Sequence, residues 1–336
     1  MAKLQEINQV GKREDLRDII SLIDAKKYPL TTLASKGMGS PQNTLVEWQV
    51  DSYPAASFDG VLETEDVSAH EDMAAQRKRL ATRIQIFQRS PMVGRLAEEV
   101  SNVAGIGKNG EMARSIRKSM EMIKRDIESA FGSDRESQVE SGLSPYRTRG
   151  LGVWIQNSAQ NDLPVDATYR SPTASIDTTA TGSLTEPNVN AVLASIWDQT
   201  GEDVIYQLIA GRALRSRFST FTQTQFGSTN VASAIRTFTS SMEAKKISAT
   251  IDVYEGDFGT IELIASAFNA ADNASTAVQR ARGYLVRQDN INLLFAVPLR
   301  RQNLPDLGGG PRELIWCAAA VCVTNPLGLA KFAATS

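Results

Sequence analysis

The sequence is poor in the residues from which catalytic and metal centres are built. Its 336 residues include one histidine, His70, and two cysteines, Cys317 and Cys322. A zinc site needs three or four ligands from His, Cys or acidic side chains, and a Ser-His-Asp centre needs a histidine held in place. His70 lies in a charged stretch beside Glu71 and Asp72, so we interpret it as an exposed loop residue, with a hard-cation site at the two carboxylates as the minor alternative. The composition therefore predicts no catalytic residue, no metal and no cofactor.

Long apolar runs are also missing. The longest, Leu314 to Val323, is far shorter than the roughly 20 residues that span a bilayer, and the polar N-terminus lacks the apolar core of a signal peptide. The two cysteines lie five positions apart in this run, on opposite faces of a strand, which predicts buried thiols rather than a disulfide. We expect a soluble protein that is not exported and has no membrane partner.

Neither sign of charge dominates. The chain has a formal charge of -2 and a pI near 5.7, whereas a dedicated nucleic-acid-binding domain usually has a pI above roughly 9. This argues against such a binder and leaves open weak, non-specific contact with nucleic acid. Hydrophobic residues make up 42% of the chain, enough for a real core, and the length predicts two subdomains or one domain with large projections.

The most informative pattern that is present is an interrupted hairpin near the N-terminus. Apolar residues alternate in one strand and again in a second strand about thirty residues later; these residues are Val46, Trp48 and Val50, then Leu80, Thr82, Ile84 and Ile86. The segment that joins the strands is sorted by charge, and its acidic residues come first. They are Glu63, Glu65, Asp66, Glu71 and Asp72, and the basic residues that follow are Arg77, Lys78, Arg79, Arg83 and Arg89. Such a segment has too little apolar content to form its own core. We therefore predict that it packs against a neighbouring copy of the chain, where its acidic half can face the basic half of the identical segment.

Helical periodicity predicts a short N-terminal helix and one long helix. The first helix carries an apolar stripe of Leu16, Ile19, Ile20 and Ile23. It is predicted to end at Tyr28-Pro29, before an extended connection over residues 31–44. A further helical stretch opens at Pro91 and runs through Val103. The long helix begins at Glu111 and stops at Gly132; its stripe consists of Met112, Ile116, Met120, Ile123, Ile127 and Phe131.

The second half of the chain mixes helices and strands, which makes the fold class α+β. Residues 133–184 are rich in small polar residues and predict loops and small strands. Thr185 is the predicted cap of a helix that contains Val189 to Trp197, and a second helix is predicted from Glu202 to about Leu214. The predicted strands are residues 247–253, 260–264, 284–287, 293–297 and 314–323, the first two joined by a hairpin turn over 255–259.

Two glycine-rich segments have the spacing of anion-binding loops. Residues 105–110, Gly-Ile-Gly-Lys-Asn-Gly, match GxGxxG and precede a helix, as in a dinucleotide-binding fold. The context differs, because the preceding residues are predicted to be helical and no acidic residue ends a second strand about 20 residues later. We therefore favour a flexible joint between helices and keep a nucleotide-dependent soluble enzyme as the alternative of another class. Leu307 to Pro311 is interpreted as a turn between strands.

Several uncommon residues keep a distinctive order in two blocks. The first block contains Glu14-Asp15-Leu16, Ile19-Ile20, Ile23-Asp24, Tyr28-Pro29-Leu30, Thr31-Thr32-Leu33, Glu47-Trp48-Gln49 and Asp51-Ser52. The second contains Val323-Thr324-Asn325-Pro326, Gly328, Ala330 and Lys331. Together with the element order, these blocks resemble the major capsid proteins of tailed phages, which have the Hong Kong 97-like fold. More specifically, the chain resembles the phage major head protein family once catalogued as a domain of unknown function.

This resemblance implies a structural protein that assembles into the icosahedral head shell of a tailed phage and encloses its double-stranded DNA. The implied partners are further copies in hexamers and pentamers, a portal, possible decoration or scaffold proteins and weakly bound DNA. The implied location is the virion, with assembly in the host cytoplasm. An encapsulin-like cellular shell that encloses cargo is the alternative within the same fold.

The resemblance also implies a division of the chain. We expect an N-terminal arm over 1–44, an extended loop hairpin over 45–90, a peripheral domain over 91–184, an axial domain over 185–310, and a closing strand with the C-terminal segment over 311–336. Contacts between subunits are expected from the arm residues Leu16, Ile19, Ile20 and Ile23. The loop residues expected to make such contacts are Glu63, Glu65, Asp66, Glu71, Asp72, Arg77, Lys78 and Arg79.

Overall fold

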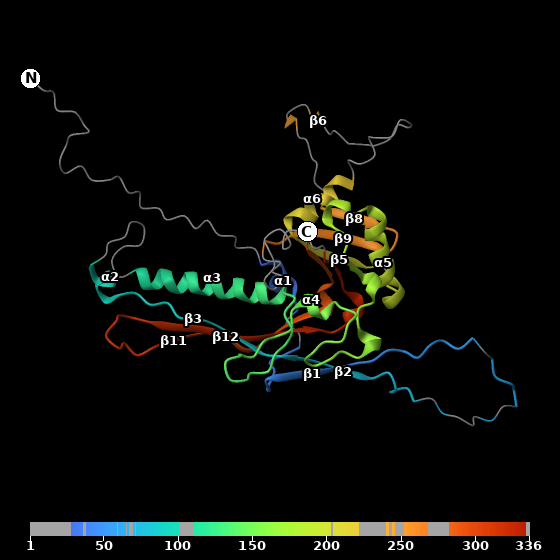
Figure 1. Cartoon of the computed structure of the whole chain (residues 1–336), viewed down its shortest axis with the longest axis horizontal. Helices are drawn as coiled ribbons and strands as arrows, with labels where there is room; N and C mark the ends of the chain where they lie inside the picture. Colours follow the sequence, from blue (N-terminus) through green and yellow to red (C-terminus); the bar gives the residue numbers. More distant parts are fainter. Residues whose placement is uncertain are drawn as a thin grey trace, which may run out of the picture. The chain divides into compact units, whose positions relative to one another are not determined.

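A computed structural model describes residues 28–35, 38–58, 60–64, 66, 70, 72–100, 110–202, 204–221, 240–241, 244–245, 252–267 and 282–333 (Figure 1). The predicted arm helix, most of the GxGxxG segment and the strand positions 247–251 lie outside this part of the chain. The helices within it include α1 (Pro29–Leu33), α2 (Arg95–Val100), α3 (Glu111–Phe131), α4 (Leu151–Trp154), α5 (Glu186–Thr200) and α6 (Arg212–Phe221). The strands include β1 (Leu45–Val50), β2 (Lys78–Arg83), β3 (Gln85–Arg89), β4 (Ile176–Asp177), β5 (Ile205–Ala210), β6 (Ser240–Ser241), β7 (Ala244–Lys245), β8 (Val253–Gly256), β9 (Gly259–Ala265), β10 (Gly283–Val286), β11 (Ile291–Asn303), β12 (Glu313–Val323) and β13 (Ala330–Phe332).

These residues divide into two compact units. The described parts of 88–122 and 301–315 form the smaller unit, and the other described residues form the larger one. Helix α3 and strands β3, β11 and β12 contribute residues to both. In the part of the chain that the structure describes, no helix is long and apolar enough to cross a bilayer.

Helix α3 forms where its apolar stripe predicts it. It runs from Glu111 to Phe131, and the stripe residues Met112, Ile116, Ile123, Ile127 and Phe131 are buried. Gly132 follows the last helical residue, and its N–H donates to the Glu128 carbonyl at 3.0 Å. The predicted helix and its end at Gly132 are confirmed. An amphipathic stripe of this length specifies a helix almost without help from distant residues, which is why the sequence predicts it.

A six-stranded mixed sheet forms the core of the larger unit. The strand order is β4-β13-β10-β5-β9-β8, and β5 lies antiparallel to β10 and parallel to β9. Helices α5 and α6 contribute to the same buried cluster as the sheet, with members such as Leu193, Phe218 and Leu263. The helix predicted from Glu202 to about Leu214 is wrong, because residues 205–210 form the buried strand β5. An apolar run that is buried on both faces of a central strand cannot be told from a buried helix by periodicity alone.

Other predicted elements of the second half are confirmed. Helix α5 follows Thr185, although the Thr185 hydroxyl makes no capping bond to a backbone N–H. Strands β8 and β9 form the expected hairpin around Asp257-Phe258. Strands β11 and β12 cover the predicted positions, and β11 extends further, to Asn303. Strand β10 runs from Gly283 to Val286 and so ends one residue before the predicted Arg287. Cys317 and Cys322 are buried free thiols in β12, and burial raises the pKa of Cys317 to about 11.

Strands β1 and β2 confirm the interrupted hairpin. They pair antiparallel from Leu45 opposite Arg83 to Val50 opposite Lys78. After Ile84, the chain leaves this pair and enters β3, an edge of the three-stranded sheet β11-β12-β3. The predicted alternation is therefore wrong at its end, because Ile86 is exposed. The chain changes sheets at Ile84, so the face that is buried also changes.

Three helices differ from the sequence prediction in their existence or in where they begin. Pro29 starts α1, since proline at the first helical position has no N–H to leave unpaired; the helix predicted to end here lies outside the described residues. Residues 31–33 are thus helical rather than extended. Helix α2 begins at Arg95 and not at Pro91. The apolar island at Val153 and Trp154 belongs to helix α4 within a region that is otherwise largely loop and turn, as predicted.

Candidate functional site

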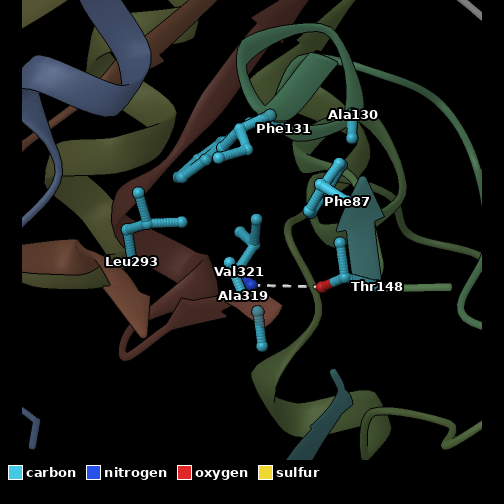
Figure 2. A pocket seen from close by; sticks show the side chains of 9 residues that line it. Phe87, Ala130, Phe131, Thr148, Leu293, Ala319 and Val321 are labelled. Carbon is cyan, nitrogen blue, oxygen red and sulfur yellow. Dashed lines mark hydrogen bonds between the residues drawn. The ribbon is translucent and has the colours of Figure 1, made fainter. Parts of the chain in front are cut away.

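A pocket in the larger unit offers little chemistry (Figure 2). Its lining is Phe87, Ile127, Ala130, Phe131, Thr148, Leu293, Ala319, Ala320 and Val321. The one hydroxyl among them, Thr148 Oγ1, accepts a hydrogen bond from the Val321 N–H at 3.1 Å. No group of three His, Cys, Asp or Glu side chains is placed to hold a metal among the described residues, and His70 is exposed. Because neither the pocket nor His70 offers catalytic or metal-binding chemistry, we take the extended loop as the candidate site of contact with other subunits.

The extended loop, residues 51–77 between β1 and β2, carries exposed apolar side chains. In Figure 1 its described residues reach beyond the ends of the paired strands. Tyr53 and Phe58 are each 98% exposed, and Val61, Leu62 and Met73 are also exposed. Clusters of exposed apolar residues mark sites of protein contact. The sequence reasoning missed them because it weighed only the charges of this segment.

The predicted acidic contact residues belong to the middle of the extended loop's sequence, around Phe58 to Asp72, which we call its tip. Glu63, Asp66 and Asp72 are exposed, whereas Glu65 and Glu71 lie outside the described residues. The Asp72 carboxylate accepts the Ala74 N–H at 2.9 Å and so shapes its own turn. Within the described part of the chain, Glu63 and Asp66 have no ion-pair partner. Their carboxylates are available to another molecule.

The predicted basic contact residues lie at the other end of the extended loop and have partners in their own subunit. Arg77 pairs with Asp51 at 3.2 Å. Arg79 pairs with Glu47 at 3.4 Å, and Lys78 lies 4.0 Å from Asp166. The structure thus does not bring the acidic and basic groups of the loop together. Exposed pairs of this kind contribute only about 0–1 kcal/mol each, so they orient the root of the loop more than they stabilise it.

Buried and half-buried contacts hold the root of the extended loop, which we define as β1, β2 and the residues packed on them. Arg83 of β2 donates from Nε and Nη2 of its guanidinium to the two carboxylate oxygens of Asp162, at 2.8 and 3.0 Å. The hydrogen bond from Arg83 holds the pKa of Asp162 below its usual value. Tyr169 donates its hydroxyl to the Gln76 carbonyl at 2.8 Å. The chain leaving the loop is therefore fixed at two successive points.

Arg149 is the buried centre of this root. Its side chain is fully buried, its Nε donates to Glu136 at 3.0 Å, and its Nη2 donates to the carbonyl oxygens of Leu163, at 2.7 Å, and of Asp162. Burial lowers the pKa of Arg149, and the nearby Glu136 carboxylate opposes that shift. Asp162 in turn holds Arg83, so Arg149 supports β2 through a single intermediate.

Arg149 also supports β1, through a stack of aromatic rings. Its guanidinium lies 4.6 Å from the ring centroid of Trp154. The Trp154 ring lies 5.7 Å from that of Trp48, which belongs to β1. Trp48 also donates its indole N–H to the Val323 carbonyl at 3.2 Å. Cation–π and aromatic contacts of this kind gain strength when water is excluded. Arg149 therefore supports both β1 and β2 of the hairpin.

A second anchor lies where the predicted N-terminal arm meets the larger unit. The buried carboxylate of Glu128 on α3 accepts the N–H groups of Leu30 and Thr31 at 2.9 and 2.8 Å. These N–H groups are unpaired at the start of α1, and an anionic acceptor suits that end of a helix. Burial raises the pKa of Glu128, against the effect of the two hydrogen bonds. The predicted arm contacts at Leu16, Ile19, Ile20 and Ile23 lie outside the described residues.

Comparison with known families gives a match over nearly the whole chain. The family model described as SU10 major capsid protein matches residues 3–336. No curated protein matches the sequence.

Solved capsid structures share the fold at low sequence identity. A chain of the cyanophage A-1(L) capsid asymmetric unit is 11% identical, with 99% of this chain and 100% of that chain covered and a TM-score of 0.68. A chain from Gordonia phage Cozz is 13% identical, with 97% and 92% covered and a TM-score of 0.57. The capsid of the native GTA particle gives 12% identity, 98% and 97% coverage and a TM-score of 0.58. At these identities the likeness establishes the fold, which is Hong Kong 97-like, as the sequence resemblance implied.

Proposed function

The chain belongs to the SU10 major capsid protein family, and from that premise we propose that its extended loop binds the neighbouring subunit in the shell. The protein is a major capsid protein of a tailed phage and forms the virion shell; it is not an enzyme. The family supports this function over the encapsulin-like shell and over the nucleotide-dependent enzyme.

The single observation that carries the proposal is the exposure of Tyr53 and Phe58. Aromatic side chains that are 98% exposed gain nothing from folding of their own subunit. Covering apolar surface is favourable at roughly 25 cal/mol per Å², so a neighbouring copy that covers these rings gains a contact that the free subunit lacks. Glu63 and Asp66, which have no ion-pair partner among the described residues, add a requirement for basic groups on the neighbouring subunit, which sets orientation more than affinity.

The finer organisation of the shell belongs to the same proposal. Hexamers and pentamers are its capsomers, the peripheral domain lies over 91–184 and the axial domain over 185–310. The arm contacts through Leu16, Ile19, Ile20 and Ile23, and loop contacts through Glu63, Glu65, Asp66, Glu71, Asp72, Arg77, Lys78 and Arg79, remain predictions. A portal, possible decoration or scaffold proteins, and weakly bound double-stranded DNA are its proposed partners, and the host cytoplasm is the place of assembly.

Electron microscopy of purified protein tests the proposal most directly. Wild-type subunits should form closed shells, and the double variant Phe58→Ser with Leu62→Ser should leave most subunits free. The matched control is Val139→Ser with Leu143→Ser, which removes two exposed apolar side chains outside the loop. Circular dichroism spectra should be the same for all three proteins.

Three outcomes would count against parts of this account. Wild-type protein that forms no shells under any condition contradicts self-assembly. Shells that enclose a protein cargo instead of DNA point to the encapsulin-like alternative. Normal shells from the loop variant, with equal yield, contradict the proposal that the extended loop binds the neighbouring subunit.

A further inference from the structure

The solvent-facing side of helix α3 carries cations that neither the fold nor the extended loop uses. Arg117 and Lys118 lie three and four residues after Arg114, which places the three side chains on one face of the helix. This face is opposite the buried apolar stripe. Arg117 and Lys118 are exposed, and Arg114 is half-buried. We call Arg114, Arg117 and Lys118 the basic face.

The charges of the basic face are not neutralised within the described part of the chain. None of its three residues forms an ion pair there, Glu121 one turn further along included. Two other carboxylates of α3 are engaged elsewhere, because Glu128 accepts the N–H groups at the start of α1 and Asp126 lies close enough to Cys317 to help raise the pKa of that thiol. The basic face is therefore available to an anionic partner.

The basic face has no apolar component. No large apolar side chain of α3, which the structure describes in full, is exposed. A protein partner is usually anchored by large apolar or aromatic side chains at the centre of the interface. A nucleic-acid backbone, in contrast, binds to Lys and Arg alone, because each cation that neutralises a phosphate releases condensed counterions. The chemistry of this surface fits a phosphate polymer better than a protein.

Other parts of the chain have the opposite charge. Helix α5 and the hairpin of β8 and β9 contain no Lys or Arg, and they carry the carboxylates Glu186, Asp198, Glu255, Asp257 and Glu262. Residues 171–211 contain no Lys, Arg or His at all. The small net charge of the chain thus hides a separation of acidic from basic regions. Phosphate groups are repelled by the first and attracted by the second.

We propose that the basic face contacts the phosphate backbone of the enclosed double-stranded DNA. This inference rests on the proposed function, because the shell is what brings DNA to the subunits, and it names the residues that touch it. Phosphate contacts carry no sequence information, which suits a shell that encloses a whole genome. Three cations neutralise at most three phosphates, so each contact is weak, and the many copies in a shell add their contacts together.

The salt dependence of DNA binding tests how many cations take part. Fluorescence anisotropy measures binding of a short labelled duplex to dissociated wild-type subunits at several salt concentrations. The logarithm of the binding constant should fall with the logarithm of salt concentration at a slope of about -3, since each phosphate contributes about -0.9. In Arg117→Gln with Lys118→Gln the slope should approach about -1, and the affinity at low salt should fall at least about tenfold. Glutamine preserves the helix.

Two further variants separate position from net charge. Arg212→Gln with Arg300→Gln removes the same charge from two exposed positions outside α3, and its slope should stay near the wild-type value. The exchange Arg117→Lys with Lys118→Arg keeps both charges and should also leave the slope unchanged. Circular dichroism checks that every variant is folded.

Site-directed cleavage tests the contact inside the assembled head. Cys317 and Cys322 are buried, so Lys118→Cys supplies an accessible thiol that can carry an iron–EDTA label. Radicals from this label should cut the enclosed DNA in filled heads. The same label on Arg212→Cys, in α6, should leave the DNA largely intact.

The outcomes separate this inference from the one on which it rests. If wild type forms no shells, the proposed function fails, and the DNA measurement on dissociated subunits can still be read. If shells form while the slope is the same in wild type and Arg117→Gln with Lys118→Gln, only the basic-face inference is overturned. It is also overturned if this variant raises the subunit concentration needed for assembly and binds DNA as wild type does, because the basic face would then bind another subunit.

Discussion

The root and the tip of the extended loop differ in where their side chains find partners. At the root, Arg149 is fully buried and Trp48 stacks on Trp154. At the tip, Phe58 is almost entirely exposed, and Leu62 is exposed as well. The same hairpin therefore has one end that is complete within the subunit and one end that is not. Stability of the subunit should depend on the root, and assembly should depend on the tip.

This difference also shows what the sorted charges do. The basic residues near the root, Arg77 and Arg79, pair with Asp51 and Glu47 of the same chain. The acidic residues at the tip have no such partners among the described residues. The sorting thus places paired charges beside the root and, among the described residues, acidic charges without an ion-pair partner further along the loop, near the exposed Phe58. A partner for the tip needs apolar surface and basic groups.

The largest effect on subunit stability is expected from Arg149→Ala. Removing this buried cation leaves Glu136 and two backbone carbonyls without their donor, which should lower the free energy of unfolding by roughly 3–5 kcal/mol. Urea unfolding of the free subunit measures it. The control Arg215→Ala breaks a mostly exposed pair with Asp252 and should cost about 0–1 kcal/mol. Equal losses in the two variants would remove Arg149 as the centre of the root.

A smaller effect is expected from Trp48→Leu. Loss of the stack on Trp154 should cost about 1–2 kcal/mol, part of it from the aromatic contact and part from buried area. Hydrogen exchange should quicken in β1 and β2 before it does elsewhere. Trp197→Leu, which breaks the similar ring contact with Phe258 at 5.9 Å, should leave exchange in the hairpin unchanged. Uniform acceleration in both variants would contradict a local role for Trp48.

Acid should weaken the ion pair between Arg83 and Asp162 at the root of the loop. The hydrogen bond from Arg83 lowers the pKa of Asp162, so the carboxylate stabilises the fold at pH values above the ordinary aspartate pKa of about 3.9. That stability is lost as the pH falls through the lower value in the folded state. Wild type should therefore lose its stability advantage over Asp162→Asn below about pH 4. A difference that stays constant between neutral and acid pH would show that the Arg83 pair contributes nothing.

The smallest effect on the free subunit is expected at the tip. Phe58→Ser with Leu62→Ser should change the free energy of unfolding by no more than about 0.5 kcal/mol, because both side chains are already in water. The same variant is expected to assemble poorly. Urea unfolding and light scattering on one preparation measure both properties. A clear loss of subunit stability would mean that the tip packs on its own subunit in solution.

The sequence predicts local elements better than it predicts how they pair. Met112 to Phe131 define α3 from their own spacing, and Cys317 and Cys322 are recognisable as buried residues of an apolar strand. Residues 205–210 do not reveal their pairing with β9 and β10, because a central strand is specified by neighbours far along the chain. Arg149 carries no local signal, since its partners Glu136 and Leu163 come together only through loops.

The passage of one strand from one sheet to another gives the hairpin a mechanical property. Strand β2 ends at Arg83 and β3 begins at Gln85, so a single residue, Ile84, separates the pairing with β1 from the pairing with β12. A pull on the loop tip therefore travels along covalent backbone directly into a second sheet. Tension applied by a neighbouring subunit would be spread over two sheets before any strand could yield.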